Sequence, residues 1–361
     1  MNHIPPALLS PPPTMSLSKG LCGLTNIGNT CYGNATLQAL RHQVDLTIYI
    51  LQDQHLEHLK TKKPSEKTAL VESYGELVKA MWTGSDPVVK TRDFWLKMIP
   101  AASKVGFEQF AMAIPHDSHE FLMFLLDQIH EGLAEEVSMT IKPSVSQPEV
   151  FQALTYWKQS FEKSYSPMVE LLFLLRRKSV VCSTCNNESV SWEHRNTTEL
   201  CVSKSATPVE LIDLMVDDCK GEDIDEYHCL KCPTRSKATV KYAYWRLGNW
   251  VIITLKRNEN SGQRINTHVN IPSSINFSKV FHENSEETSA SAEYELFSTI
   301  EHHGTNRGGH YTSHAKHPVS GKWFFYDDER AHAVDDVRIN HSTYTVMYRK
   351  KVMAPPPCDL D

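Results

Sequence analysis

A cysteine near the start of the chain and a histidine near its end are the residues that most constrain the fold. Cys31 follows a turn sequence at 28–30 and precedes an apolar run that suits a buried helix. We therefore expect Cys31 in the first helical turn, where the helix dipole and free N–H groups favour a thiolate. His310 follows two glycines that would let a narrow peptide approach its imidazole. Only a tertiary fold can unite residues so far apart in sequence.

The surroundings of Cys31 and His310 decide between a reactive pair and two unrelated residues, because a lone cysteine on a helix is usually a small buried residue. Asn26 can aim an amide donor at an oxyanion forming beside the sulfur. Asp327 follows His310 after a turn near 318–321, so two antiparallel strands would bring its carboxylate beside the imidazole. Thiol, imidazole and acid are the groups that a cysteine protease requires. Asp328 would orient a water or assist Asn26.

The composition excludes several classes of protein. A hydrophobic share of 40% and a charged share of 22% are typical of a globular protein with a sizeable core. The net charge of −6 gives no support for nucleic-acid binding, and no apolar run is long enough to span a membrane. The proline-rich beginning argues against a secretory signal, so we expect a protein of the cytoplasm, the nucleus or both. With 9 cysteines, metal ligation and nucleophilic chemistry are better uses than a disulfide framework.

Hydrophobic patterns predict helices in the first part of the chain and strands in the second. The chain looks helical to about residue 134, and an apolar stripe runs from Leu70 to Met81 and ends near Gly84. Residues 140–168 show little pattern and suggest a linker or an irregular insertion. Strand-forming residues dominate from about 170, and 258–262 predicts a turn between strands.

Two C-x-x-C pairs predict a metal site in the strand-rich part. Each pair forms a short turn that points two sulfurs at one centre, so together they offer four thiolates in tetrahedral geometry. Such a set leaves no open position for water, so one structural zinc ion is expected. The alternatives are four unrelated thiols or redox pairs, and two nearby histidines, His194 and His228, are expected on the surface. The four candidate ligands are Cys182, Cys185, Cys229 and Cys232.

Four separated motifs resemble those of the ubiquitin-specific proteases. The stretch GLTNIGNTCYGNATLQAL, from Gly23 to Leu40, is similar to the cysteine box of that family. PHDSHEFL is similar to its Q-x-D-A-x-E-F-L element, WVIITLKRN to its strand ending L-K-R-F, and GGHYT with the downstream WFFYDD to its histidine box. The chain departs from the family pattern at His116 and at Asn258, where an aromatic residue is usual.

The resemblance implies roles for single residues. Cys31 would be the nucleophile, His310 the general base and acid, Asp327 the group that orients the imidazole, and Asn26 the oxyanion donor. Asp117 would hold the arginine-bearing tail of ubiquitin, although a helix cap explains an aspartate at this position equally well. Within the histidine box, the expected substrate contacts are Gly309 and Tyr311.

The same resemblance implies an α+β, papain-like fold in a single catalytic domain over residues 19–351. A helical thumb would cover about 20–168, zinc-bearing β fingers about 169–245 and a β palm about 246–351, between a proline-rich disordered tail at 1–18 and a tail at 352–361. The implied activity is hydrolysis of the bond after the C-terminal Gly-Gly of ubiquitin through a thioester, with no catalytic cofactor.

The expected partners are ubiquitin or ubiquitinated proteins, with no nucleic acid and no membrane, and the chain is expected to be a monomer. Three alternatives stay open. They are a weakly catalytic ubiquitin-binding member, a protease for a ubiquitin-like modifier, and a zinc-ribbon nucleic-acid adaptor, which the acidic balance disfavours.

Overall fold

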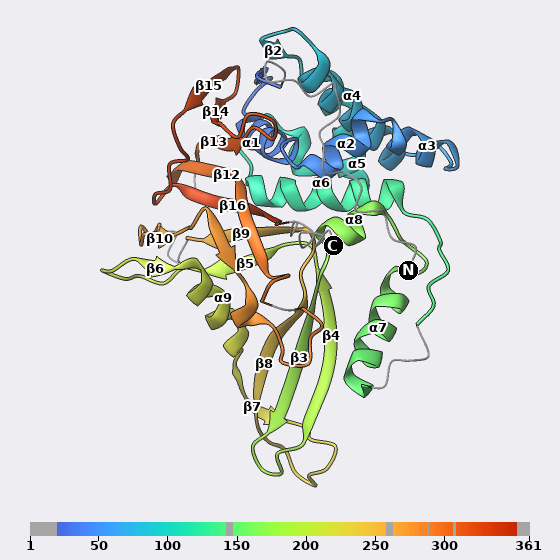
Figure 1. The fold of residues 1–361 in the computed structure, drawn as a ribbon, viewed down its shortest axis with the longest axis vertical. Helices are drawn as coiled ribbons and strands as arrows, with labels where there is room; N and C mark the ends of the chain where they lie inside the picture. Colours follow the sequence, from blue (N-terminus) through green and yellow to red (C-terminus); the bar gives the residue numbers. More distant parts are fainter. Residues whose placement is uncertain (1–19, 142–146, 258–262, 288, 306–307, 352–361) are drawn as a thin grey trace, which may run out of the picture.

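The computed structural model describes residues 20–141, 147–257, 263–287, 289–305 and 308–351. The two predicted tails and Asn258 with its predicted turn therefore lie outside the described residues. A group of helices, a large sheet and a smaller, elongated sheet make up the structure (Figure 1). None of the helices in the described part is long and apolar enough to cross a membrane.

The helical group is formed mainly by the first part of the chain, as predicted. The stripe from Leu70 to Met81 lies on α4, and its residues are buried. Gly84 caps the end of this helix, as the pattern indicates. The helices of this group are α1 (Cys31–Leu40), α2 (Val44–Leu51), α3 (Gln54–Lys60), α4 (Glu66–Thr83), α5 (Arg92–Lys104), the 3-10 helix η1 (Glu108–Ala111) and α6 (Ser118–Leu133).

The prediction of an irregular segment at 140–168 is wrong for its described residues. They contain α7 (Pro148–Phe161), which begins with a proline at its first turn, and the start of α8 (Pro167–Leu172). One face of α7 is buried through Val150, Ala153, Trp157 and Phe161, which recur at helical spacing. The helical signal was therefore present in the sequence. Figure 1 shows α7 alongside the smaller sheet.

The large sheet has 8 strands and contains the second half of the expected site. Its main path runs β15, β14, β13, β12, β16, β9 and β5, and β11 pairs with β12. Apart from the parallel pair β5–β9, neighbouring strands are antiparallel. The bounds are β5 (Thr198–Cys201), β9 (Trp250–Lys256), β11 (Ser274–Asn276), β12 (Glu293–Thr305), β13 (Gly308–Lys316), β14 (Trp323–Asp327), β15 (Arg330–Val334) and β16 (Thr343–Lys350).

The smaller sheet is antiparallel and has 4 strands in the order β4, β3, β8 and β7. It extends away from the helices and the large sheet (Figure 1). Its strands are β3 (Leu174–Cys182), β4 (Glu188–Arg195), β7 (Asp223–Tyr227) and β8 (Ser236–Arg246). The remaining elements are the pairs β1 (Gly23–Leu24) with β2 (Val88–Val89) and β6 (Val209–Glu210) with β10 (Val269–Asn270), the helix α9 (Leu211–Lys220) and the 3-10 helix η2 (Ser278–Val280).

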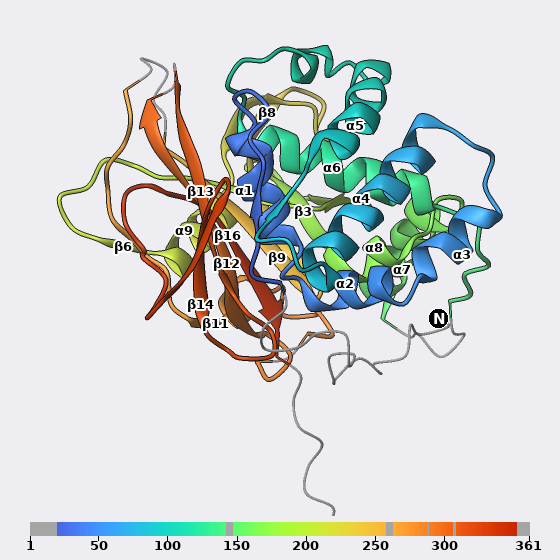
Figure 2. The ribbon, with the colours of Figure 1, turned by 90° about the horizontal axis from the view of Figure 1, so that it is seen from above.

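Helix α1 lies between the helical group and the large sheet. Figure 2 shows it flanked by helices on one side and by β12, β13 and β14 on the other. Because both sides are covered, all of its residues are buried, the polar Asn34 and Gln38 included. The start of this helix therefore faces the strand that carries His310.

Candidate active site

Cys31 is the first residue of α1, as the sequence predicts, and Thr30 precedes it as the N-cap. The hydroxyl of Thr30 bonds the preceding turn, where it accepts from the backbone N–H of Ile27 and donates to Oδ1 of Asn26, and it does not cap the first N–H groups of the helix. Only 6% of Cys31 is exposed. The preceding turn is closed by Asn26, whose Oδ1 accepts hydrogen bonds from the backbone N–H groups of Gly28 (3.0 Å) and Thr30 (3.2 Å). The glycine at 28 has φ of 122°, which a side chain would strain.

Asp328 connects this turn to the large sheet. Its Oδ2 accepts a hydrogen bond of 2.8 Å from Nδ2 of Asn26, and its Oδ1 accepts one of 2.8 Å from Nδ2 of Asn34. Asp328 has φ of 47°, so its carboxylate is presented from a left-handed turn after β14. The contact of Asn34 with Asp328 was not predicted from the sequence. The available signal was the position of Asn34 one helical turn after Cys31, on the same side of the helix.

His310 and Asp327 come together through the hairpin that the sequence predicts. Strands β13 and β14 pair antiparallel, and Nε2 of His310 lies 2.6 Å from Oδ1 of Asp327. A hydrogen bond with Cys31 is the main cause that raises the pKa of His310 to about 9, and the bond with Asp327 adds to it against the opposing effect of burial. The imidazole is therefore positively charged at neutral pH. The structure brings together a thiol, an imidazole and a carboxylate from α1, β13 and β14.

Asp117 is the N-cap of α6, and its carboxylate is fully engaged. Oδ1 accepts hydrogen bonds from the backbone N–H groups of His119 (2.7 Å) and Glu120 (3.1 Å), and Oδ2 accepts one of 2.8 Å from Oη of Tyr344. Burial, followed by the charge of Asp117, raises the pKa of Tyr344, so this tyrosine remains a donor. Tyr344 is not distinguished by the sequence, because a tyrosine within a strand pattern is typical of ordinary packing.

Gly309 and Tyr311 lie on either side of His310 in β13. A Cβ at position 309 would come within 2.5 Å of Nε2 of His302, so close strand packing by itself requires a glycine there. Tyr311 is buried, and its ring stacks on His302 with centroids 4.4 Å apart. Both residues thus have packing roles, and their contact with a substrate stays a prediction.

His116, where the chain departs from the family pattern, is part of an aromatic cluster. Its ring meets Tyr32 and Phe110 edge-on, with centroid distances of 5.3 Å in both cases. Tyr32 follows Cys31 directly, so His116 supports the helix that carries the cysteine.

The four cysteines of the two C-x-x-C pairs converge where β3 ends and after β7. Their sulfur atoms lie within 4.8 Å of one another, with 3.8 Å between Cys182 and Cys232 and 3.6 Å between Cys185 and Cys229. The backbone N–H of Lys231 donates to the sulfur of Cys229, as in a turn that wraps an ion. Neither His194 nor His228 belongs to the group. The donor set and its spacing fit a tetrahedral zinc ion.

Comparisons with known proteins agree with this geometry. The sequence model described as "Ubiquitin carboxyl-terminal hydrolase" matches residues 22–348. Ubiquitin carboxyl-terminal hydrolase 2 is 29% identical over 94% of this chain in Rattus norvegicus and in Homo sapiens, covering 55% and 56% of those relatives. The chain thus spans about half the length of the curated relatives it matches first, although it covers 97% of the relative of the same name from Gallus gallus, at 27% identity.

Among solved structures, the fold is similar to a chain of the SAGA DUB module of Ubp8, Sgf11, Sus1 and Sgf73 bound to monoubiquitin. The TM-score is 0.70 at 19% identity, over 93% of this chain and 70% of that chain. A yeast SAGA DUB module gives the same values.

Proposed function

Because the chain belongs to the ubiquitin carboxyl-terminal hydrolase family, we propose that it is a deubiquitinating cysteine protease, which cleaves the peptide or isopeptide bond after the C-terminal Gly-Gly of ubiquitin. One observation carries this proposal: Cys31, far from His310 in the chain, is the first cause of the raised pKa of His310, and Oδ1 of Asp327 lies 2.6 Å from Nε2 of the same histidine. This arrangement is what nucleophilic acyl transfer by a thiol requires.

In the proposed reaction, the sulfur of Cys31 attacks the carbonyl carbon of the terminal glycine. The charged His310 then gives its proton to the leaving amine as the carbon–nitrogen bond breaks, which leaves a thioester on the sulfur. A water molecule attacks the thioester while His310 takes a proton from it, and the thiolate leaves. Asp327 keeps the ring oriented throughout, so no cofactor takes part in these steps.

Asn26 is the proposed donor to the oxyanion that forms beside the sulfur. An amide nitrogen carries two hydrogens, and the bond to Asp328 uses one of them. The second is free to point at the developing negative charge. Asp328 thereby acts as the residue that orients the amide, which is a more specific role than holding a water.

The proposed contact for the arginine-bearing tail of ubiquitin is Asp117, with Gly309 and Tyr311 lining the path to the sulfur. Since Tyr344 and two backbone N–H groups already bond the carboxylate of Asp117, an arginine would have to share or displace the tyrosine hydroxyl. An arginine would therefore add an ion pair to the hydrogen bonds that this carboxylate accepts.

We also propose the division into thumb, fingers and palm, with the zinc ion as a structural staple of the fingers. Four thiolates would fill the coordination of the ion, so its contribution is to folding and to the shape of the β3, β4, β7 and β8 sheet. The cysteines of the described part are all free thiols. A monomer in a reducing compartment, cytoplasm or nucleus, is the state we expect.

The experiment that tests the function uses ubiquitin with a C-terminal electrophile. The wild type should form a covalent adduct, and Cys31→Ala should form none. Cys201→Ala is the matched control, because this cysteine is exposed on β5 and has no imidazole partner in the proposed chemistry. An adduct with a ubiquitin-like modifier but none with ubiquitin would show that the proposed substrate is wrong.

A further inference from the structure

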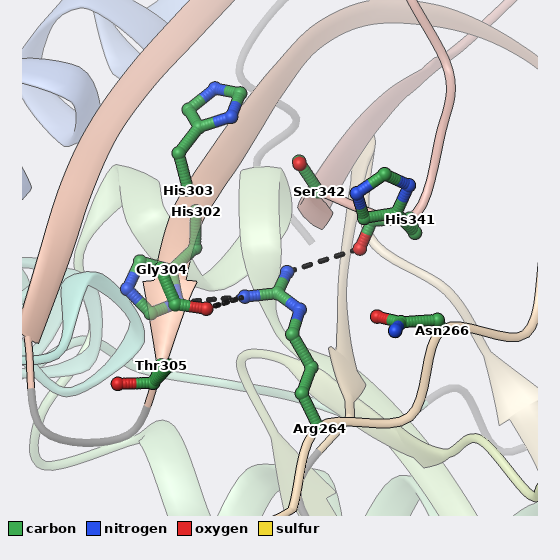
Figure 3. Close-up of a pocket in the computed structure, with 8 residues that line it drawn as sticks. All are labelled: Arg264, Asn266, His302, His303, Gly304, Thr305, His341 and Ser342. Atoms are coloured by element: carbon green, nitrogen blue, oxygen red, sulfur yellow. Dashed lines mark hydrogen bonds between the residues drawn. The ribbon is translucent and has the colours of Figure 1, made fainter.

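A line of polar side chains continues from His310 into the large sheet. Across β12 and β13, Glu301 pairs with Thr312 and His303 pairs with His310. Side chains alternate along a strand and directly paired residues share a face, so these four side chains lie on one face. Figure 3 shows the neighbouring His302 directed toward Arg264 and His303 directed away from it.

On the opposite face of the β12–β13 hairpin, His302 contacts Arg264. Arg264 lies in a pocket of about 420 Å³ and donates hydrogen bonds to Nδ1 of His302 (3.2 Å) and to the carbonyl of His341 (3.0 Å). His303, a member of the polar line, also lines this pocket, although its imidazole is directed away from Arg264 (Figure 3).

Hydrogen bonds connect the members of the line. Thr312 Oγ1 donates to Oε2 of Glu301 at 3.4 Å, and Nε2 of His303 lies 3.1 Å from the same hydroxyl. Since the hydroxyl proton points to the carboxylate, Thr312 accepts from His303, which fixes the tautomer of His303 with hydrogen on Nε2. Glu301 also accepts from Thr299 and lies 3.1 Å from Nδ1 of His314.

The burial of this line needs an explanation. Glu301, Thr312 and His314 are 1%, 3% and 4% exposed. A buried carboxylate with an imidazole is weak evidence for stability, because apolar residues of similar volume stabilise a core at least as well. The carboxylate of Glu301 lies 3.1 Å from Nδ1 of His314 without forming a hydrogen bond, on the same face of β13 as the hydrogen-bonded pair Asp327–His310. Its position beside the proposed active site indicates an electrostatic role.

We propose that Glu301, acting through Thr312 and His303, is a positioning residue that favours the charged form of His310. The buried carboxylate supplies negative charge behind the imidazole, and the fixed neutral ring of His303 adds no competing positive charge. This inference rests on the proposed function only in the choice of the reacting pair, Cys31 and His310.

The charges that face His310 come from every element around it. They are the thiol of Cys31 on α1, Asp327 and Asp328 at the end of β14, and His303 with Glu301 on β12. Burial, together with the charges of His310 and Arg264, lowers the pKa of His303 against the opposing charge of Glu301. His303 is therefore neutral at pH 7.

The first test removes the buried charge with Glu301→Gln, which keeps the size and hydrogen-bonding ability of the side chain. The rate of alkylation of Cys31 by iodoacetamide is followed against pH by mass spectrometry of the Cys31 peptide, because the other cysteines also react. This assay needs no ubiquitin, so its result is independent of the substrate. We expect the titration of His310, followed by its NMR ring signals and by the pH at which the alkylation rate changes, to move down by about half a pH unit.

The matched control is Glu295→Gln. Glu295 lies near the other end of β12 and pairs with Arg349 at 2.7 Å, so its loss removes one carboxylate from the same strand away from His310. An unchanged titration of His310 in a folded Glu301→Gln variant would overturn the proposal. So would an equal shift in both variants, since it would reflect net charge alone.

A second variant keeps the proposal falsifiable if the buried substitution prevents folding. His303 lies at the exposed end of β12, so His303→Lys places a permanent positive charge beside His310 without disturbing the core. We expect the titration of His310 to move to lower pH, while the melting temperature stays within about 2 °C of the wild type. No shift in this variant would overturn the coupling between His303 and His310.

Discussion

The molecule contains two cysteine sites with different expected roles, and the neighbours of each thiol account for the difference. Cys31 stands alone at the start of α1, and its interaction with His310 raises the pKa of that imidazole. At the far end of the smaller sheet, four cysteines face one another with sulfur–sulfur distances of 3.6 and 3.8 Å. A thiolate beside an imidazolium is available to attack a substrate, whereas four convergent thiolates fill the coordination of a metal ion and no longer act as nucleophiles. One centre should therefore control the rate and the other the stability.

The largest expected effect is the loss of activity when the sulfur of Cys31 is removed, which distinguishes Cys31 from the cysteine cluster. Cys31→Ala should lower kcat/KM for ubiquitin cleavage by at least about 10⁴-fold, because no other group forms the thioester. The melting temperature should stay close to that of the wild type. Residual cleavage above about 1% would contradict the assignment of the nucleophile.

Asp327→Asn should come next, with kcat lowered by about 10³- to 10⁴-fold. The amide keeps the shape but removes the negative charge that favours a proton on Nε2 of His310. The pKa of His310 should also fall, since the carboxylate helps to raise it. A steady-state assay paired with an NMR titration of the histidine ring checks both statements, and a full-rate variant would exclude Asp327 as the orienting group.

Asn26→Ala should lower kcat by about 10²- to 10³-fold with little change in KM, as expected for a donor that acts on the transition state. Asn34→Ala is the comparison variant, because Asn34 also bonds Asp328 but lies within the helix. It should have a smaller effect on kcat. A loss confined to KM in Asn26→Ala would show that the amide binds the ground state instead.

Changes in the cysteine cluster should lower the stability of the protein and leave the reactivity of Cys31 unaffected. Cys182→Ser, or a strong chelator, should lower the melting temperature by about 5–10 °C and weaken ubiquitin binding. The alkylation rate of Cys31 should be unchanged. Metal analysis of the purified protein should give one zinc ion per chain, and unchanged melting together with a substoichiometric metal content would contradict a structural zinc.

The smallest expected effect is on the pH dependence of stability and activity. The pKa of His310 is raised to about 9 from the usual 6.5, so the interaction with Cys31 and Asp327 contributes its full stability below pH 6.5 and is lost as the pH rises through 9. Activity should fall over the same interval. His310→Gln should lack this component of the pH dependence of melting, which a series of thermal scans between pH 6 and 10 measures.

Local patterns in the sequence were sufficient for much of the fold. The α4 stripe, the start of α1 at Cys31 and the β13–β14 hairpin depend on neighbours within a few residues or on one turn, and they were predicted correctly. The helix α7 was missed although its buried residues follow a helical period. An exposed aromatic residue on its outer face, Phe151, obscures that pattern.

Contacts between distant segments could not be read in the same way. Tyr344 bonds Asp117, and Glu301 lies beside His314, although nothing in the sequence around these residues distinguishes them from ordinary strand and cap residues. Their partners depend on how strands register and on how α6 approaches the sheet. These arrangements result from the packing of many side chains together.

The sequence by itself determined the kinds of groups present: a thiol at a helix start, an imidazole after two glycines, an acid one hairpin later and two cysteine pairs. The tertiary structure decided which of them meet. It brought Asp328 to both Asn26 and Asn34, engaged both oxygens of Asp117, and placed a buried carboxylate behind the histidine. Residue type and local spacing fix short-range geometry, whereas the distance between groups hundreds of residues apart depends on the whole core that packs between them.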